Sequence, residues 1–399
     1  MNATFRNFTC SRTLLRVLLA CLSGLMLLGG CGGGVDTGGT GSFSSGPITG
    51  FGSVIVNGVR YDESMASVQD DEGATRASSE LRLGMMVDID ASGVGSDANG
   101  PVATAHTIRF GSEIVGPVGS VDASGGSLVV LGQTVRVNTS TVFDESFAGG
   151  LAGVSVGQVI EVHGQFDVPS QSYTATRVEP KAGASLYKLR GIVSQLDTTA
   201  RTFRIAGQTI NYAGVASADL PNLLVNGRFV RVIVRTTQVG GQWVAVAVRA
   251  GVRLLVDGRE AKLEGRISAF TSTSQFNVNG IAVDASSASF PDGTAGVVLG
   301  ARVAIDGVVQ GGAVVARQVD IQTDDRLRDR GFELIGIISA VDTAAKTLVL
   351  RGVTINYAFT LRYDNGTEAS LAPGRRVDVR GILSADRTRL VSTRIIFLN

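Results

Sequence analysis

Short runs in which apolar and polar residues alternate recur along the whole chain. One such run reads LGMMVDIDA at 83–91 and returns as PGRRVDVRG at 373–381. Apolar side chains at every second position predict a β-strand with one buried face. The runs are rich in Val and Ile and are separated by glycine-containing turns, so the pattern predicts an all-β protein.

This strand occurs five times, each time just after a glycine: the copies begin at Gly84, Gly157, Gly227, Gly300 and Gly374. The third and fifth residues after the glycine are apolar in every copy: Val87 and Ile89, Ile160 and Val162, Val230 and Val232, Val303 and Ile305, Val377 and Val379. Upstream of each copy the sequence predicts a hairpin with glycine in its turn, because a two-residue primed turn requires positive φ. These turns are Asn57-Gly58, Leu131-Gly132, Ala206-Gly207, Asn279-Gly280 and Arg351-Gly352.

The repetition divides the chain into five units of about 70 residues each. Their expected bounds are 46–112, 113–181, 185–251, 259–323 and 331–399. A small open sheet would expose long edges, so each unit is expected to close into a barrel. The fold prediction is therefore a tandem array of about five small closed or OB-like β-barrels, with a shortened or missing first hairpin in the first unit.

Two other β architectures fit less well. A two-layer sandwich usually needs about 100 residues, more than each unit has. A single outer-membrane barrel needs strands of about 9–11 residues, longer than the alternating runs in this sequence.

Composition agrees with globular modules and argues against nucleic-acid binding. Hydrophobic residues make up 44% of the chain and charged residues 18%, and the net charge is only +1. A duplex DNA binder needs a strongly basic surface, which this balance does not provide. Aromatic residues are 6% and Trp243 is the single tryptophan, so a base-stacking surface is not expected either. Trp243 is expected to pack in a core or at a strand edge.

The N-terminus has the pattern of a secretory signal. A basic segment that ends at Arg16 precedes the apolar run VLLACLSGLMLL at 17–28. This run is much shorter than the ~20 residues that cross a bilayer as a helix. Small residues follow it, so a cleaved signal peptide is expected at 1–30.

The end of this signal resembles the lipobox of bacterial lipoproteins, which here would be Leu28, Gly29, Gly30 and Cys31. The resemblance implies cleavage before Cys31 and attachment of lipid to its thiol. The next segment, 31–45, is rich in Gly and Ser and is expected to be a flexible tether. Gly32, where an Asp would retain enteric lipoproteins in the inner membrane, favours the outer membrane of a bacterial cell envelope.

The repeated pattern resembles a known family of bacterial exported proteins and lipoproteins. Its elements are an opening Gly-x-[IV], a strand-Gly hairpin, the phrase Gly-x-x-[VI]-x-[VI]-x-Gly and a closing strand similar to ATRVEP at 175–180. The sequence ITGFGSVIVNGVRYD at 48–62 is also similar to the openings of such lipoproteins. On these residues the chain resembles the domain-of-unknown-function family 5666, which implies no activity and no catalytic residues.

Candidate chemistry is sparse. The two histidines, His106 and His163, lie in different units, and His163 is expected on the solvent side of its strand. No nucleophile or zinc motif is present, so no catalytic residue, cofactor or metal site is expected. The segment DIDASGVGSDAN at 88–99 imitates a calcium loop through Asp88, Asp90 and Ser92, but its last position is Asn99 where a bidentate Glu is required.

These observations lead to an expectation of a non-catalytic protein, anchored to the membrane through its N-terminal lipid. Its barrels would act as spacers or as surfaces for another envelope protein or a glycan. The alternative is a periplasmic or surface binding protein that holds a glycan or a cation between adjacent barrels.

Overall fold

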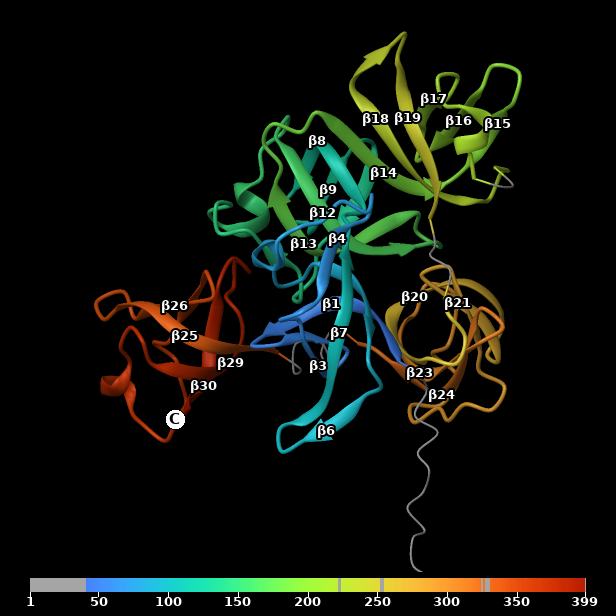
Figure 1. Cartoon of the computed structure of the whole chain (residues 1–399). Coiled ribbons are helices and arrows are strands. Elements are labelled where there is room, and N and C mark those ends of the chain that lie inside the picture. The colour runs from blue at the N-terminus through green and yellow to red at the C-terminus, as the bar shows by residue number, and fades with distance from the viewer. Residues whose placement is uncertain (1–40, 222–223, 252–254, 324–325, 327–330, 399) are drawn as a thin grey trace, which may run out of the picture. The chain divides into compact units, whose positions relative to one another are not determined.

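The computed structural model describes residues 41–221, 224–251, 255–323, 326 and 331–398 (Figure 1). The expected lipidation site Cys31 and its neighbours Leu28, Gly29 and Gly30 lie outside the described residues. The described chain is built from strands, as the alternating pattern predicts, but several are longer than the alternating runs, such as Glu260–Ser272 with 13 residues. Among these residues, no helix has both the length and the apolar character needed to cross a membrane.

The strands fall into five groups that follow the predicted repeats. Repeat 1 contains β1 (Ser42–Phe51), β2 (Val54–Val56), β3 (Val59–Asp62), β4 (Ser67–Asp70), β5 (Met86–Ala91), β6 (Gly95–Asp97) and β7 (Gly100–Phe110). Repeat 2 contains β8 (Ile114–Asp122), β9 (Ser127–Val130), β10 (Gln133–Arg136), β11 (Val142–Phe143), β12 (Val159–Asp167) and β13 (Ser172–Pro180). Repeat 3 contains β14 (Leu186–Ile192), β15 (Ser194–Asp197), β16 (Thr202–Ile205), β17 (Gln208–Asn211), β18 (Phe229–Val239) and β19 (Gln242–Ala250).

The last two repeats have the same plan. Repeat 4 contains β20 (Glu260–Ser272), β21 (Gln275–Val278), β22 (Ile281–Asp284), β23 (Arg302–Gln310) and β24 (Ala313–Ile321). Repeat 5 contains β25 (Phe332–Asp342), β26 (Thr347–Leu350), β27 (Val353–Asn356), β28 (Arg362–Asp364), β29 (Arg376–Leu383) and β30 (Leu390–Leu398). Single 3-10 turns occur at η1 (Ser78–Glu80), η2 (Gly150–Gly153), η3 (Ser217–Asp219) and η4 (Glu368–Ser370).

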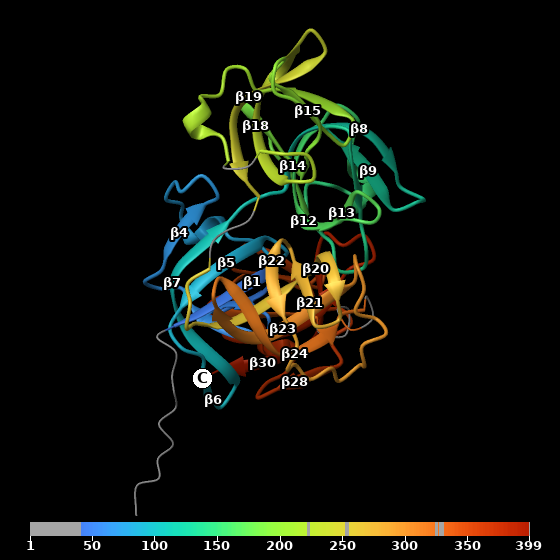
Figure 2. The same cartoon turned by 90° about the vertical axis from the view of Figure 1, so that its right-hand side faces the viewer.

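Each repeat closes into a small barrel. In repeat 2, β8 pairs antiparallel with β9 and with β12, β9 pairs with β10, β10 runs parallel to β13, and β13 pairs with β12. Repeat 4 closes in the same order, β20-β21-β22-β24-β23, and returns to β20. Figure 1 shows repeat 4 end-on as a ring, and Figure 2 shows the same strands from the side. The prediction of an all-β tandem array of small closed barrels is confirmed.

The two sequence signals that defined the repeats have the expected structural roles. Both residues of the repeated turn have positive φ, for example 53° at Asn57 and 75° at Gly58. All ten apolar residues of the repeated strand are buried. In repeat 1, β1 and β2 are joined directly at Gly52 and Ser53, so its first hairpin is short, as expected.

The start of repeat 1 differs from the expectation of a flexible tether that ends at residue 45. β1 begins at Ser42, and the side chains from Ser42 to Ser45 are buried. This segment pairs antiparallel with β5 and parallel with β20, so strands cover it on both edges. The segment from Ser42 to Ser45 forms a strand because β5 and β20 provide hydrogen-bond partners for its backbone. Composition alone does not reveal these partners.

Candidate functional site

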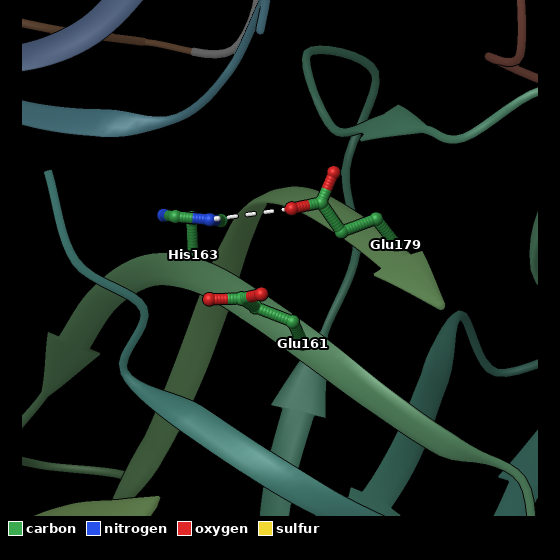
Figure 3. A group of neighbouring side chains, drawn as sticks. All are labelled: Glu161, His163 and Glu179. Atoms are coloured by element: carbon green, nitrogen blue, oxygen red, sulfur yellow. Dashed lines mark ion pairs between the residues drawn. The ribbon is translucent and has the colours of Figure 1, made fainter. Parts of the chain in front are cut away.

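Three side chains that can ligate a metal meet on one face of the β12-β13 hairpin in repeat 2. Glu161 and Glu179 are directly opposite each other in the antiparallel register. His163 is two residues beyond Glu161 on the same strand and therefore shares its face. One ligand atom from each of the three residues lies within 4.8 Å of the others, and Figure 3 shows the three side chains pointing toward one another. This set is called the Glu-His-Glu cluster below.

The expectation that His163 faces solvent is wrong, because its side chain is 0% exposed. Its neighbour Val162 lies in the barrel core, so the imidazole points away from that core. The connection between β7 and β8 passes next to the ring, and the carbonyl of Gly111 lies 3.1 Å from Nδ1. A strand position that is outward in one barrel is thus buried by another segment of the chain.

The two nitrogens of His163 have different surroundings. A carbonyl oxygen can only accept, so Nδ1 donates its hydrogen to Gly111. Nε2 faces Oε1 of Glu179 at 3.8 Å, which is too long for a hydrogen bond. Among the described residues, Nε2 has no hydrogen-bond partner although it is fully buried.

Two basic side chains support the carboxylates. Nε of Arg177 donates to Oε2 of Glu179 at 2.7 Å, and a terminal nitrogen of Arg177 lies 3.2 Å from Asp144. Nζ of Lys181 lies 2.6 Å from Oε2 of Glu161. Because Arg177 takes Oε2 of Glu179, the other oxygen of that carboxylate is directed at His163.

Both carboxylates of the cluster are held in their ionised form. Burial alone would raise the pKa of Glu179, but His163 and Arg177 outweigh it and lower that pKa to about 2. Burial likewise opposes ionisation of Glu161, yet His163 and Lys181 hold its pKa below the usual value. Negative charge is therefore concentrated next to a buried imidazole.

Nearby, burial raises the pKa of Glu113, an effect that Arg190 partly offsets. A terminal nitrogen of Arg190 lies 3.2 Å from the Glu113 carboxylate.

The cluster is specific to repeat 2. The other barrels place different pairs at the register positions of Glu161 and Glu179: Asp88 and Arg109, Arg231 and Arg249, Ala304 and Asp320, Asp378 and Ile396. The position of His163 is filled there by Asp90, Ile233, Asp306 and Arg380. Each of these four barrels lacks at least one of the three ligands.

The weak calcium candidate has no loop around it. Asp88 and Asp90 lie on the extended strand β5, and Ser92 follows its end. The Asp90 carboxylate lies 2.8 Å from Arg259 and 3.3 Å from Arg109. The hydroxyl of Ser92 accepts a hydrogen bond from the Thr104 amide. Two guanidinium groups therefore pair with the Asp90 carboxylate.

The other singled-out aromatic and histidine residues have structural positions. Trp243 is buried, donates to the side-chain oxygen of Gln208 at 3.0 Å and packs edge-on against Tyr187, so the packing prediction is confirmed. His106 is exposed on β7.

Sequence reasoning missed the Glu-His-Glu cluster because its members do not form a familiar zinc motif. The available signal was the pair Glu161 and His163 at strand spacing, followed by Glu179 on the next strand of a hairpin. Counting the register back from the turn between β12 and β13 would have placed Glu161 opposite Val178, because the sequence does not reveal the β-bulge at His163 and Gly164 that brings the two glutamates opposite each other.

Comparison with known proteins places three of the repeats in one family. Residues 115–179, 264–320 and 335–396 match the family described as Domain of unknown function (DUF5666). No curated protein matches the chain. A solved structure described as "drosophila Unr CSD456" matches with 12% identity over 53% of this chain and 97% of that chain, at a TM-score of 0.12, which carries no structural argument. The chain is thus a tandem β-barrel array in which three segments match the DUF5666 family.

Proposed function

We propose that the protein is a non-catalytic, lipid-anchored component of the bacterial cell envelope whose barrels serve as spacers or interaction modules. The observation that supports this proposal is the repeated use of one barrel with different outward residues. The inward Val and Ile positions recur in all five repeats, whereas the outward positions of the same strand hold Asp, Glu, Arg, His, Ile or Ala. Repetition of this kind preserves a fold and leaves its surfaces free to diverge.

The proposed anchor is Cys31, with Leu28, Gly29 and Gly30 as the recognition sequence before it. Two or three acyl chains, each contributing ~0.8 kcal/mol per buried CH₂, would hold the protein stably at a membrane. Gly32 supports location in the outer membrane.

Labelling tests the anchor directly. The full chain and Cys31→Ser would be expressed in a bacterial host with labelled palmitate and then fractionated. We expect the wild-type chain to incorporate the label and to appear in the outer-membrane fraction. The variant should do neither. Cys21→Ser is the matched control, because that residue lies in the segment expected to be removed, and it should behave as wild type. Equal labelling of Cys31→Ser would refute the anchor.

An activity screen tests the non-catalytic part of the proposal. The purified chain would be assayed with generic hydrolase and transferase substrates before and after a second purification step. An activity that stays with the protein and is lost on substitution of described residues would overturn this part.

The alternative is a binding protein, and the Glu-His-Glu cluster favours a cation over a glycan as its ligand. The cluster lies within repeat 2, whereas the sequence-based alternative places the ligand between barrels. Glycan arrays on the full chain and thermal shifts with calcium would test that alternative. Binding of a glycan, or a shift caused by calcium, would favour it over a spacer role.

A further inference from the structure

The Glu-His-Glu cluster places two carboxylates next to a buried imidazole nitrogen that has no hydrogen-bond partner among the described residues. Glu161 and Glu179 are direct cross-strand neighbours, and like charges in that position repel. Arg177, the direct cross-strand neighbour of His163, and Lys181 offset part of the repulsion, and each contacts an Oε2 atom.

The orientation of His163 is that of a metal ligand. A histidine that binds a metal through one nitrogen usually donates the hydrogen on its other nitrogen to a carbonyl or carboxylate, which sets the tautomer and the ring plane. Nδ1 of His163 makes this bond with Gly111. In the neutral ring Nε2 then carries a lone pair, and this lone pair faces a carboxylate oxygen at 3.8 Å. A cation between these two electron-rich atoms would be attracted to both of them.

The distances fit a small ion. A tetrahedral ion that lies ~2.0–2.2 Å from nitrogen and oxygen ligands separates those ligands by about 3.4 Å. Nε2 and Oε1 of Glu179 are 3.8 Å apart, and all three ligand atoms lie within 4.8 Å of one another. The side chain of Lys181, the partner of Glu161, is about half exposed and can follow a movement of that carboxylate.

The donor set identifies the class of ion. Calcium takes six to eight oxygen ligands, and three residues that include an imidazole do not supply them. One imidazole and two carboxylates suit a first-row transition ion, and zinc accepts this combination with water in the fourth position. We propose that Glu161, His163 and Glu179 bind one divalent transition-metal ion, with Zn²⁺ as the best fit, through Nε2 of His163 and one oxygen of each glutamate.

Zinc titration of the full chain, purified in detergent and stripped with a chelator, tests this proposal. We expect one saturable Zn²⁺ per wild-type chain and no comparable binding of Ca²⁺. His163→Gln removes the imidazole, and it should weaken Zn²⁺ binding at least about 100-fold, more than loss of a supporting contact does. Glu179→Gln should also weaken it. His106→Gln, at the exposed histidine, is the matched control and should bind as wild type.

A Co²⁺ spectrum separates this site from adventitious binding to thiols. Cobalt in the proposed site should give visible bands typical of nitrogen and oxygen ligands, without the charge-transfer band of a thiolate, and His163→Gln should abolish them. Circular dichroism checks that each variant is folded. If His163→Gln does not fold, zinc binding by Glu179→Gln provides the test.

Three results would overturn the proposal: no saturable Zn²⁺ binding, unchanged binding in folded His163→Gln, or a thiolate spectrum. Any of them would make the cluster a buried contact between side chains without a metal. The proposed envelope role does not depend on this outcome, because the palmitate and activity experiments test it separately.

Discussion

Asp378 in the strand RVDVRG should make the protein less stable as the pH rises through the weakly acidic range. Its side chain is 8% exposed, and its direct neighbours on the two flanking strands are Ile335 and Ile396. Among the described residues, Oδ1 of Asp378 has no hydrogen-bond partner, and Oδ2 lies 3.5 Å from Arg380. Burial and the charge of Glu333 outweigh Arg380 and Arg394 and raise the pKa of Asp378 to about 6.

The sign follows from proton binding. The ordinary pKa of this carboxyl is 3.8, so between about pH 4 and 6 the folded state binds more protons than the unfolded state. The free energy of unfolding therefore falls as the pH rises through this window. The shift in pKa corresponds to about 3 kcal/mol, and little solvent screening reduces it because the group is buried. Asp378→Asn removes the charge and should raise stability by about 2–3 kcal/mol at pH 8, with almost no effect near pH 4.

Hydrogen exchange of peptides from β29 and β30 measures this effect locally. Wild type and Asp378→Asn are compared at the same pH, so the intrinsic exchange rates cancel. At pH 8 exchange in the variant should be about 30- to 150-fold slower where it proceeds by opening of repeat 5.

Asp306→Asn in repeat 4 is a control of opposite sign. Burial disfavours ionisation of Asp306, but Lys262 and Arg317 hold its pKa below the usual value. That variant should lose stability above about pH 4. Equal effects of Asp378→Asn at pH 4 and pH 8, or destabilisation at pH 8, would refute the reasoning.

Two further substitutions test a buried ion pair and a turn. Arg302→Met should destabilise repeat 4 by about 3–5 kcal/mol, because it leaves Glu264, whose side chain is 1% exposed, without the guanidinium that compensates its charge. Urea unfolding would measure this loss, and the double variant Glu264→Leu with Arg302→Met should recover most of it. Ala206→Asn should stabilise repeat 3 by about 0.5–1 kcal/mol, because Ala206 has a φ of 45° and Asn tolerates this region better. Trp243 fluorescence in repeat 3 reports its unfolding, and Ala206→Val should shift the midpoint the other way.

The turns and strand faces could be predicted because their causes are local. Positive φ at Asn57-Gly58 and its four counterparts depends on two residues, and the burial of Val377 and Val379 follows from the two-residue period of a strand. The number of repeats and closure into small barrels follow from these signals together with the length of each unit.

The sequence by itself therefore determined the all-β class, the five modules, their turns and the inward face of each repeated strand. Tertiary structure alone decided which outward residues are buried. His163 is covered by the connection at Gly111, Asp378 lies between two isoleucines, and Ser42–Ser45 form a strand between β5 and β20. Each of these outcomes depends on contact with residues distant in the chain, and the period of a single strand carries no information about such contacts.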